Sequence, residues 1–267
     1  MTIGSLLTKC TQRASFEARA FYYKNFAAYS RSPNLKIFEC PLCGWSGPFM
    51  TIYPTYGQRL HAVCPKCRAA ERHRLQQLVL DNILAQFSPG DKRCLQFAPD
   101  QMTDILKRLF GEGSIVADLE PKRGSMMNVD MRSIQFPNNS FDFIFASHVL
   151  EHIKEDTVAL AECYRILKPG GMAVLPVPIV CSNTIEYPFA VPEEAGHVRA
   201  PGMDYFDRYR SVFDSVRIFT SDDFDERYQL YIFEDRTQVP NEHCPYRTKM
   251  EGDRHIDAVP VCQKLSN

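Results

Sequence analysis

Four cysteines in the first quarter of the chain have the spacing of metal ligands. They form two pairs with two residues inside each pair and twenty residues between the pairs: Cys40, Cys43, Cys64 and Cys67. Each pair can present two thiolates to one ion from a tight turn, and two pairs complete a tetrahedral shell of four sulfurs, as in a zinc ribbon. Because no position is left for water, we expect the zinc to be structural and not catalytic.

Other interpretations of the cysteine segment remain open. His61 could serve as an alternative ligand, although a histidine satisfied by its protein neighbours is favoured. The two C-x2-C pairs could also do redox chemistry, but a thioredoxin-like motif needs only one pair. The segment is basic and contains aromatic residues, which would suit contact with nucleic acid. Its cations are spread over about forty residues and form no dense stripe, so solvated cations around a small aromatic core are favoured slightly.

The composition is that of an ordinary globular protein, with 267 residues, a formal net charge of -1 and 45% hydrophobic residues. This length allows one large α/β domain and a small accessory module. No apolar run approaches the ~20 residues that span a bilayer, and the N-terminal stretch lacks the features of a secretory signal. We therefore expect a cytoplasmic protein in which the cysteines outside the two pairs are reduced thiols.

The elements that position the chemistry are clearest in residues 136–178. Residues 141–146 form a short apolar run that predicts a buried strand. Apolar residues then recur at helical spacing over residues 159–167, and Lys168-Pro169-Gly170-Gly171 is predicted to end that helix. Residues 172–177 are a second apolar run, too short for a globular helix. Strand, helix, glycine turn and strand form a βαβ unit, which requires a parallel sheet.

The same patterns predict the helices and strands in the rest of the chain. We expect helices over residues 5–30, 71–87, 102–110 and 205–213, and strands over 93–98, 114–119, 128–129, 216–219 and 258–262. The first helix could cap a substrate site or lie at an interface, but packing on the domain surface is favoured. These elements divide the chain into an N-terminal helix (1–35), a zinc ribbon (36–70) and an α/β domain (71–267) with an insertion around 235–256.

Three motifs in this region resemble the second half of class I S-adenosylmethionine-dependent methyltransferases. They are FPNNSFD at residues 136–142, SHVLEHI at 147–153 and LKPGG at 167–171. Any one of them alone is weak, but three in the right order make a strong signal, with an unrelated Rossmann-like sheet as the alternative. The resemblance implies a Rossmann-like α/β sheet with helices on both faces, S-adenosylmethionine as the cofactor and methyl transfer as the activity.

The resemblance also implies which residues bind the cofactor, because they follow successive strands. Asp118 matches the acid that accepts the ribose hydroxyls, and Glu120 is a second candidate. Asp130 matches the acid that receives the exocyclic amine of adenine, with Met131 beside the ring. Ser147 ends the strand over 141–146 and faces the crevice at the carboxyl ends of the strands, where ligands of open sheets bind.

The loop after the first strand departs from the family pattern. These enzymes place a glycine-rich loop against the methionine part of the cofactor, because a Cβ would block the close approach. Here the loop is Ala98-Pro99-Asp100, which has no glycine, and Pro99 also lacks an N–H donor. A subset of the family is similar in joining a four-cysteine ribbon to a Glu-Arg-His-Arg helix start, here residues 71–74, and to an Ala-Pro-acid loop. In that subset Ala98 supplies the small position, and we hypothesise that Asp100 contacts the ammonium group of the cofactor.

The catalytic residues are less clear from the sequence. Methyl transfer from a sulfonium is an in-line displacement in which the protein aligns donor and acceptor and sometimes removes a proton. His197 is the favoured base because its loop usually lines the acceptor site, and Arg199 would hold an anionic acceptor. His148 and His152 are expected to serve in helix packing.

The leading prediction is an S-adenosylmethionine-dependent methyltransferase that acts on a small-molecule or saccharide acceptor and contains a structural zinc. One alternative is an RNA methyltransferase whose ribbon binds nucleic acid. Another is a non-catalytic zinc-containing binding protein on a methyltransferase scaffold, which the missing glycines suggest. The sequence leaves the identity of the acceptor and the oligomeric state open.

Overall fold

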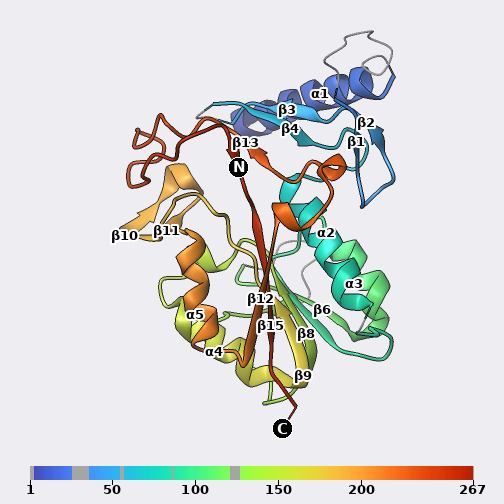
Figure 1. The fold of residues 1–267 in the computed structure, drawn as a ribbon, viewed down its shortest axis with the longest axis vertical. Coiled ribbons are helices and arrows are strands. Elements are labelled where there is room, and N and C mark those ends of the chain that lie inside the picture. The colour runs from blue at the N-terminus through green and yellow to red at the C-terminus, as the bar shows by residue number, and fades with distance from the viewer. Residues whose placement is uncertain (1–2, 26–35, 55–56, 86, 121–126, 267) are drawn as a thin grey trace.

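The computed structural model describes residues 3–25, 36–54, 57–85, 87–120 and 127–266. A seven-stranded sheet forms its centre, in the spatial order β12-β15-β9-β8-β5-β6-β7 (Figure 1). The strands from β9 to β7 run parallel to one another, whereas β15 runs antiparallel to both of its neighbours. The strands are β5 (Cys94–Phe97), β6 (Ser114–Asp118), β7 (Met127–Asn128), β8 (Phe141–Ala146), β9 (Leu167–Val174), β12 (Ser215–Thr220) and β15 (Ala258–Gln263).

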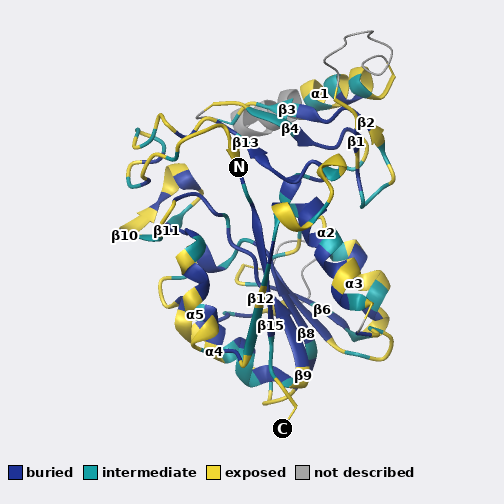
Figure 2. Ribbon diagram, viewed as in Figure 1, coloured by how far each residue is buried: buried dark blue, intermediate teal, exposed yellow. Residues whose placement is uncertain are grey.

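Helices cover both faces of this sheet, which confirms the predicted Rossmann-like α/β architecture. Helices α2 (Glu71–Leu84) and α3 (Thr103–Phe110) pack on one face, and α4 (Asp156–Ile166) and the short α5 (Asp207–Arg210) pack on the other (Figure 1). Because both faces are covered, the central strands are apolar on both sides, and Figure 2 shows them buried.

Strand β8 shows how one apolar run serves both faces. Phe143 and Phe145 belong to the core beneath α2 and α3. Ile144 and Ala146 belong to the core beneath α4 and α5. Successive side chains of a strand point to opposite faces, so a continuous apolar run is what a sheet covered on both sides requires.

One predicted boundary is wrong. The turn expected at residues 168–171 lies inside β9, because α4 ends at Ile166 and the strand begins directly at Leu167. The backbone N–H of Gly170 donates to the carbonyl of Lys264, just after β15. This hydrogen bond to the residue that follows β15 holds residues 168–171 in the sheet.

The helix expected over residues 205–213 is shorter than predicted, since a 3₁₀ turn (Met203–Phe206) precedes α5.

The cysteine segment folds as a small module beneath the N-terminal helix. Its strands are β1 (Phe38–Glu39), β2 (Ser46–Gly47), β3 (Met50–Ile52) and β4 (Arg59–Val63). Helix α1 (Ile3–Asn25) packs on β3 and β4, where Ala20 joins a buried cluster with Met50 and Ala62. The helix therefore covers the module, as the surface-packing interpretation expects, and its predicted end near residue 30 lies outside the described residues.

The module is joined to the late part of the chain. Strand β4 pairs with β13 (Ile232–Phe233), which pairs in turn with β14 (Arg254–His255). Arg74 of α2 reinforces this junction. Its fully buried guanidinium stacks over the ring of Phe49 at 4.3 Å and donates to the carbonyl of Gln229 at 2.6 Å. One side chain thus connects the module, the helix that follows it and the segment before β13.

A hairpin lies between β9 and β12. It consists of β10 (Ile185–Val191) and β11 (His197–Ala200), and β11 contacts the 3₁₀ turn after β8 (Leu150–His152). Among the helices that the structure describes, none has the length and apolar character to cross a membrane.

Candidate functional site

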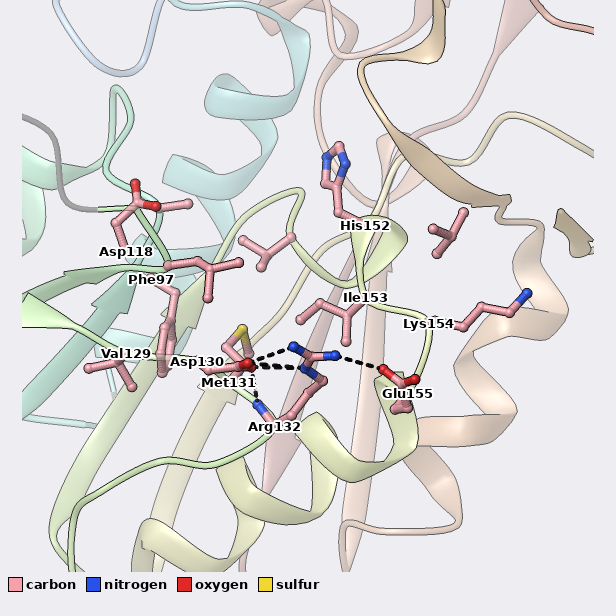
Figure 3. Close-up of a pocket in the computed structure, with 14 residues that line it drawn as sticks. Phe97, Asp118, Val129, Asp130, Met131, Arg132, His152, Ile153, Lys154 and Glu155 are labelled. Atoms are coloured by element: carbon pink, nitrogen blue, oxygen red, sulfur yellow. Dashed lines mark hydrogen bonds and ion pairs between the residues drawn. The ribbon is translucent and has the colours of Figure 1, made fainter. Parts of the chain in front are cut away.

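A cavity lies where the strand order of the sheet reverses. From β5 the chain proceeds outward to β6 and β7, and it then returns to β8 on the other side of β5. Ligands of open α/β sheets bind at the carboxyl ends of the strands at such a switch point. A cavity of about 370 Å³ occupies this place, and its lining includes residues that follow β5, β6, β7 and β8 (Figure 3). We call it the donor cavity, after the methyl donor that the sequence resemblance implies.

Four of the predicted cofactor-binding residues line the donor cavity: Ala98, Asp118, Asp130 and Met131. Ala98 has a backbone φ of 51°, in the left-handed region that glycine adopts most easily. The loop therefore makes a turn of the kind that favours glycine, although it contains none. Its small side chain keeps the backbone accessible at the floor of the cavity.

Asp118 is held in place by the backbone around it. Its Oδ1 accepts the N–H of Glu120 at 3.1 Å, and its carbonyl accepts the N–H of Val129 at 3.0 Å. The side chain of Glu120 is exposed and is not among the described residues that line the cavity. The structure thus places Asp118 at the cavity and Glu120 beside it.

Asp130 belongs to a chain of ion pairs that sequence reasoning missed. Arg132 pairs with the Asp130 carboxylate at 2.7 Å and with Glu155 at 3.0 Å, across the wall of the cavity (Figure 3). The Arg132 guanidinium, hydrogen-bonded to Asp130, holds the pKa of that carboxyl below its usual range. Arg132 and Glu155 come from separate segments, so no local pattern in the sequence links them.

Asp100 and Ser147 lie outside the described lining of the donor cavity. The Asp100 carboxylate accepts the N–H of Met102 at 2.8 Å, next to the start of α3. Ser147 is buried, and its hydroxyl accepts a hydrogen bond from the amide of Gln76 at 2.9 Å. Burial raises the pKa of Asp100. Both residues therefore belong to a polar layer between the sheet and α2.

Three histidines surround one buried carboxylate after β8. Glu151 is fully buried, and its Oε1 lies 3.4 Å from Nδ1 of His148 and 3.9 Å from Nε2 of His152. His197, from β11, contacts the ring of His152 with a centroid separation of 4.8 Å. Burial opposes ionisation of Glu151, but His148, His152 and His197 outweigh it and hold the pKa of Glu151 below its ordinary value. The structure thus groups His148 and His152 around Glu151, contrary to the expectation of helix packing.

A second cavity, of about 160 Å³, lies on the other side of these histidines. His152 lines the donor cavity, whereas His148 and His197 line the second one. Its wall is formed by the cysteine module, the end of the sheet and residues 232–257, which we call the late segment. The wall carries four arginines and two acids: Arg59, Arg72, Arg236, Arg247, Glu234 and Asp257. Three of these arginines are paired with acids: Arg59 with Glu71, Arg236 with Glu234 and Arg247 with Glu194. The wall is therefore a network of ion pairs, to which Arg72 adds a further positive charge.

The expectation that Arg199 holds an anionic acceptor is wrong. Its side chain is fully buried, and its guanidinium donates to the carbonyls of Leu150 and Ile153, each at 2.6 Å. It also pairs with Glu186 at 2.9 Å. Arg199 therefore fastens β11 to the turn after β8 and presents no donor to a ligand.

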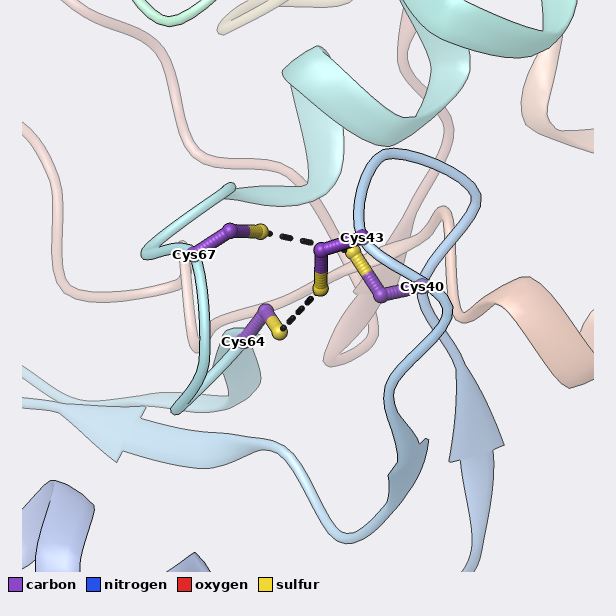
Figure 4. Close-up of side chains that lie close together, drawn as sticks. All are labelled: Cys40, Cys43, Cys64 and Cys67. Atoms are coloured by element: carbon purple, nitrogen blue, oxygen red, sulfur yellow. Dashed lines mark hydrogen bonds between the residues drawn. The ribbon is translucent and has the colours of Figure 1, made fainter.

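The four cysteines of the module converge on one point (Figure 4). Their sulfur atoms lie within 4.8 Å of one another, with 3.6 Å between Cys40 and Cys67 and between Cys43 and Cys64. A tetrahedral zinc site with bonds of about 2.3 Å has sulfur–sulfur separations of about 3.8 Å, so the donor set fits zinc. His61 is outside this set; its ring contacts Phe38 at a centroid distance of 5.1 Å.

Comparison with known proteins finds a match to the segment around the donor cavity. Residues 114–175, which run from β6 to just beyond β9, match the family model described as a methyltransferase domain. The matched residues include Asp118, Asp130 and the Glu151 turn, but they include neither the cysteine module nor the late segment of the second cavity.

Curated relatives of the methyltransferase segment are similar over limited lengths. A probable S-adenosylmethionine-dependent methyltransferase of Mycolicibacterium smegmatis is 26% identical over 87 residues, which are 31% of this chain and 34% of that protein. A ubiquinone/menaquinone biosynthesis C-methyltransferase of Desulfotalea psychrophila is 28% identical over 105 residues, covering 39% and 37%. A demethylmenaquinone methyltransferase of Staphylococcus aureus is 41% identical over 70 residues, covering 24% and 29%. The chain thus spans well under half the length of these relatives.

Among solved structures, a putative methyltransferase of Bacillus halodurans aligns with a TM-score of 0.44 and 15% identity, over 69% of this chain and 98% of that chain.

Proposed function

We propose that this protein is an S-adenosylmethionine-dependent methyltransferase that acts on a small-molecule or saccharide acceptor and contains a structural zinc. One observation carries the proposal: Ala98, Asp118 and Asp130 meet at a cavity at the switch point of the sheet, within or beside the stretch that matches a methyltransferase domain. When bound there, S-adenosylmethionine would supply an electrophilic methyl group on its sulfonium.

The residues of the donor cavity suit the parts of this cofactor. We assign the ribose hydroxyls to Asp118, because an ionised carboxylate only accepts hydrogen bonds and can take both. Asp130 and Met131 would bind the adenine, and the backbone at Ala98 would lie against the methionine part. For Asp100 and Ser147 we propose a supporting role beneath the loop, since both are hydrogen-bonded behind the cavity.

We assign the acceptor to the second cavity. Arg72 would bind an anionic group such as a phosphate or carboxylate, in the role that sequence reasoning gave to Arg199. His197 lies at the wall between the two cavities, and burial lowers its pKa to about 4. A neutral imidazole at this point has a free lone pair, which can accept a proton from the acceptor or bind a metal ion.

Two observations favour a small acceptor over RNA. The second cavity has a volume of about 160 Å³, which suits one small anionic group. Two of the relatives are named for quinone biosynthesis, which is small-molecule chemistry. RNA binding by the module and the cytoplasmic location stay predictions of the sequence.

We further propose that the zinc is structural. Its four thiols would fix the module, whose β4 pairs with β13, and the residues of β13 and just after it, Ile232 and Glu234, line the second cavity. The metal would thereby support the acceptor cavity without contacting a ligand in it.

Calorimetric titration of the zinc-loaded full chain with S-adenosylmethionine and S-adenosylhomocysteine tests the proposed function. We expect saturable binding of one equivalent of each. If neither binds at high protein concentration with zinc content confirmed, the enzyme proposal is wrong and a non-catalytic binding protein is the better description. Retention of RNA that weakens with added salt would favour the RNA methyltransferase instead, because phosphate contacts release counterions.

A further inference from the structure

Glu151 is a buried carboxylate whose ion-pair contacts, among the described residues, are with histidines alone. It has no exposed surface, and among the described residues neither of its oxygens has a hydrogen-bond partner. Nδ1 of His148 lies 3.4 Å from Oε1, a contact that becomes an ion pair only when the imidazole is protonated. Burial of an ionised carboxylate is costly unless it is hydrogen-bonded, paired or bound to a metal. The arrangement thus provides for a positive charge beside Glu151.

The polar atoms around Glu151 are also unsatisfied. Nε2 of His148 and Nδ1 of His197 are buried and have no hydrogen-bond partner among the described residues. One ligand atom from each of Glu151, His152 and His197 lies within 4.8 Å of the others. Lone pairs of imidazole and carboxylate therefore converge from two directions, the turn after β8 and strand β11.

We propose that Glu151, His152 and His197 bind a first-row divalent cation, such as Mn²⁺ or Zn²⁺, at the wall between the two cavities. Two imidazoles and one carboxylate are a typical donor set for such ions. Metal–ligand bonds of about 2.1 Å place neighbouring ligand atoms about 3 to 3.5 Å apart. The separations in the structure, within 4.8 Å, exceed this by up to about 1.3 to 1.8 Å, so rotation of the side chains would have to bring the ligand atoms together.

His148 would support this site from beside it. Its Nδ1 faces the Glu151 carboxylate, and its backbone has a φ of 57°. A non-glycine residue in this left-handed region is strained, and such strain is concentrated at functional sites. The strained turn directs the imidazole toward Glu151, where it can orient the carboxylate or complete the ligand set.

The position of the ion suggests what it would do, and this step rests on the proposed function. It would face ligands in both cavities, because His152 lines one and His197 the other. Methylation of a hydroxyl forms a carbon–oxygen bond, breaks the carbon–sulfur bond of the donor and releases one proton. A cation that binds the hydroxyl oxygen makes that proton easier to lose. We therefore infer that the acceptor is an anionic compound with a hydroxyl, and that His197 serves as a ligand and not as the base.

Titration of the zinc-loaded full chain with Mn²⁺ and Co²⁺ tests the site without using activity. We expect one equivalent of ion beyond the zinc. The Co²⁺ absorption should lack the charge-transfer band of thiolate ligands, which separates this site from the cysteines. Replacement of a ligand in His152→Gln or His197→Gln should weaken binding at least about tenfold. His152 is partly exposed, so His152→Gln should fold even if Glu151→Gln does not.

His243→Gln is the matched control, since this histidine lies in the late segment and outside both cavities' described linings. Binding in that variant should equal the wild type. The proposal is wrong if no ion binds beyond the cysteine site, or if His152→Gln and His197→Gln both bind as tightly as the wild type. Cofactor binding is measured separately, so a protein that binds S-adenosylhomocysteine but no second ion refutes only this inference.

Discussion

The ring of His152 meets the ring of His197 at 4.8 Å and close to a right angle. One histidine follows β8 and lines the donor cavity, and the other begins β11 and lines the second cavity. The contact therefore joins a residue that lines one cavity to a residue that lines the other. A methyl group that passes from one cavity to the other would pass near this pair.

Asp118 should contribute strongly to cofactor binding. Asp118→Asn removes a charged acceptor of two hydrogen bonds, and a hydrogen bond to a charged group contributes about 1.5–3 kcal/mol. We expect the affinity for S-adenosylhomocysteine to fall at least about tenfold, measured by calorimetric titration. Glu120→Gln is the matched control, because that carboxylate is two residues away and exposed, and it should change the affinity little. Equal losses in both variants would contradict the assignment.

Ala98 should tolerate glycine but not a branched residue. Ala98→Gly relieves a left-handed backbone conformation that costs roughly 1–2 kcal/mol, and it adds an entropic cost of roughly 0.5–1 kcal/mol. We expect unchanged or slightly higher stability in thermal unfolding and unchanged affinity for S-adenosylhomocysteine. Ala98→Val should lower both, since a branched side chain is more strained there and extends over the cavity floor. A destabilised glycine variant would show that the backbone conformation is not as described.

His73 should make the protein less stable in mild acid. Burial lowers its pKa to about 3, whereas an unfolded histidine has a pKa near 6.5. Between these values the unfolded chain binds more protons, so stability falls as the pH drops from about 6.5 toward 3. His73→Asn keeps an acceptor near the Ala70 N–H, which the imidazole Nδ1 accepts at 3.1 Å, but does not titrate.

Urea unfolding at pH 6.5, 5.75 and 5 measures this effect. The wild type should lose more stability than His73→Asn by up to about 1.4 kcal/mol per pH unit, the value for one proton. Acid effects on the cysteine thiols are common to both proteins and cancel in the comparison. Parallel pH profiles would mean that His73 is not buried in its neutral form.

Removal of the metal from the cysteines should destabilise the late segment at β13. Cys43→Ser should lower the unfolding temperature and increase hydrogen exchange at Ile232 and Phe233, because β4 of the module covers one edge of β13. Cys181→Ala, a buried thiol outside the cluster, is the control and should leave exchange at β13 unchanged. Normal exchange at β13 in Cys43→Ser would show that the module holds its shape without metal.

The features that could be predicted from the sequence are those that depend on residues close together in the chain. Strand β8 and helix α4 could be recognised because burial imposes a periodicity on neighbouring residues, and the cysteine pairs because each ligand turn is local. Asp118 and Asp130 could be placed because Asp118 ends β6 and Asp130 lies two residues after β7. The part of the cavity lining that lies at strand ends could therefore be predicted from the sequence.

The remainder depends on contacts between distant segments. Arg132 meets Glu155, and Glu151 meets His197, only after the sheet has formed. The predicted role of Arg199 in holding an anionic acceptor is wrong for the same reason. Its hydrogen bonds to the carbonyls of Leu150 and Ile153 join distant segments and cannot be recognised from a local sequence pattern. The arginines of the second cavity come from segments on both sides of the methyltransferase domain match.

The pairing of β4 with β13 also constrains the order of folding. The cysteine module is synthesised early, but the strand that completes its sheet follows only after most of the chain has left the ribosome. Closing so long a loop is slow relative to forming local structure. The nascent module must therefore persist with an open sheet edge, and early metal binding would protect it during that interval.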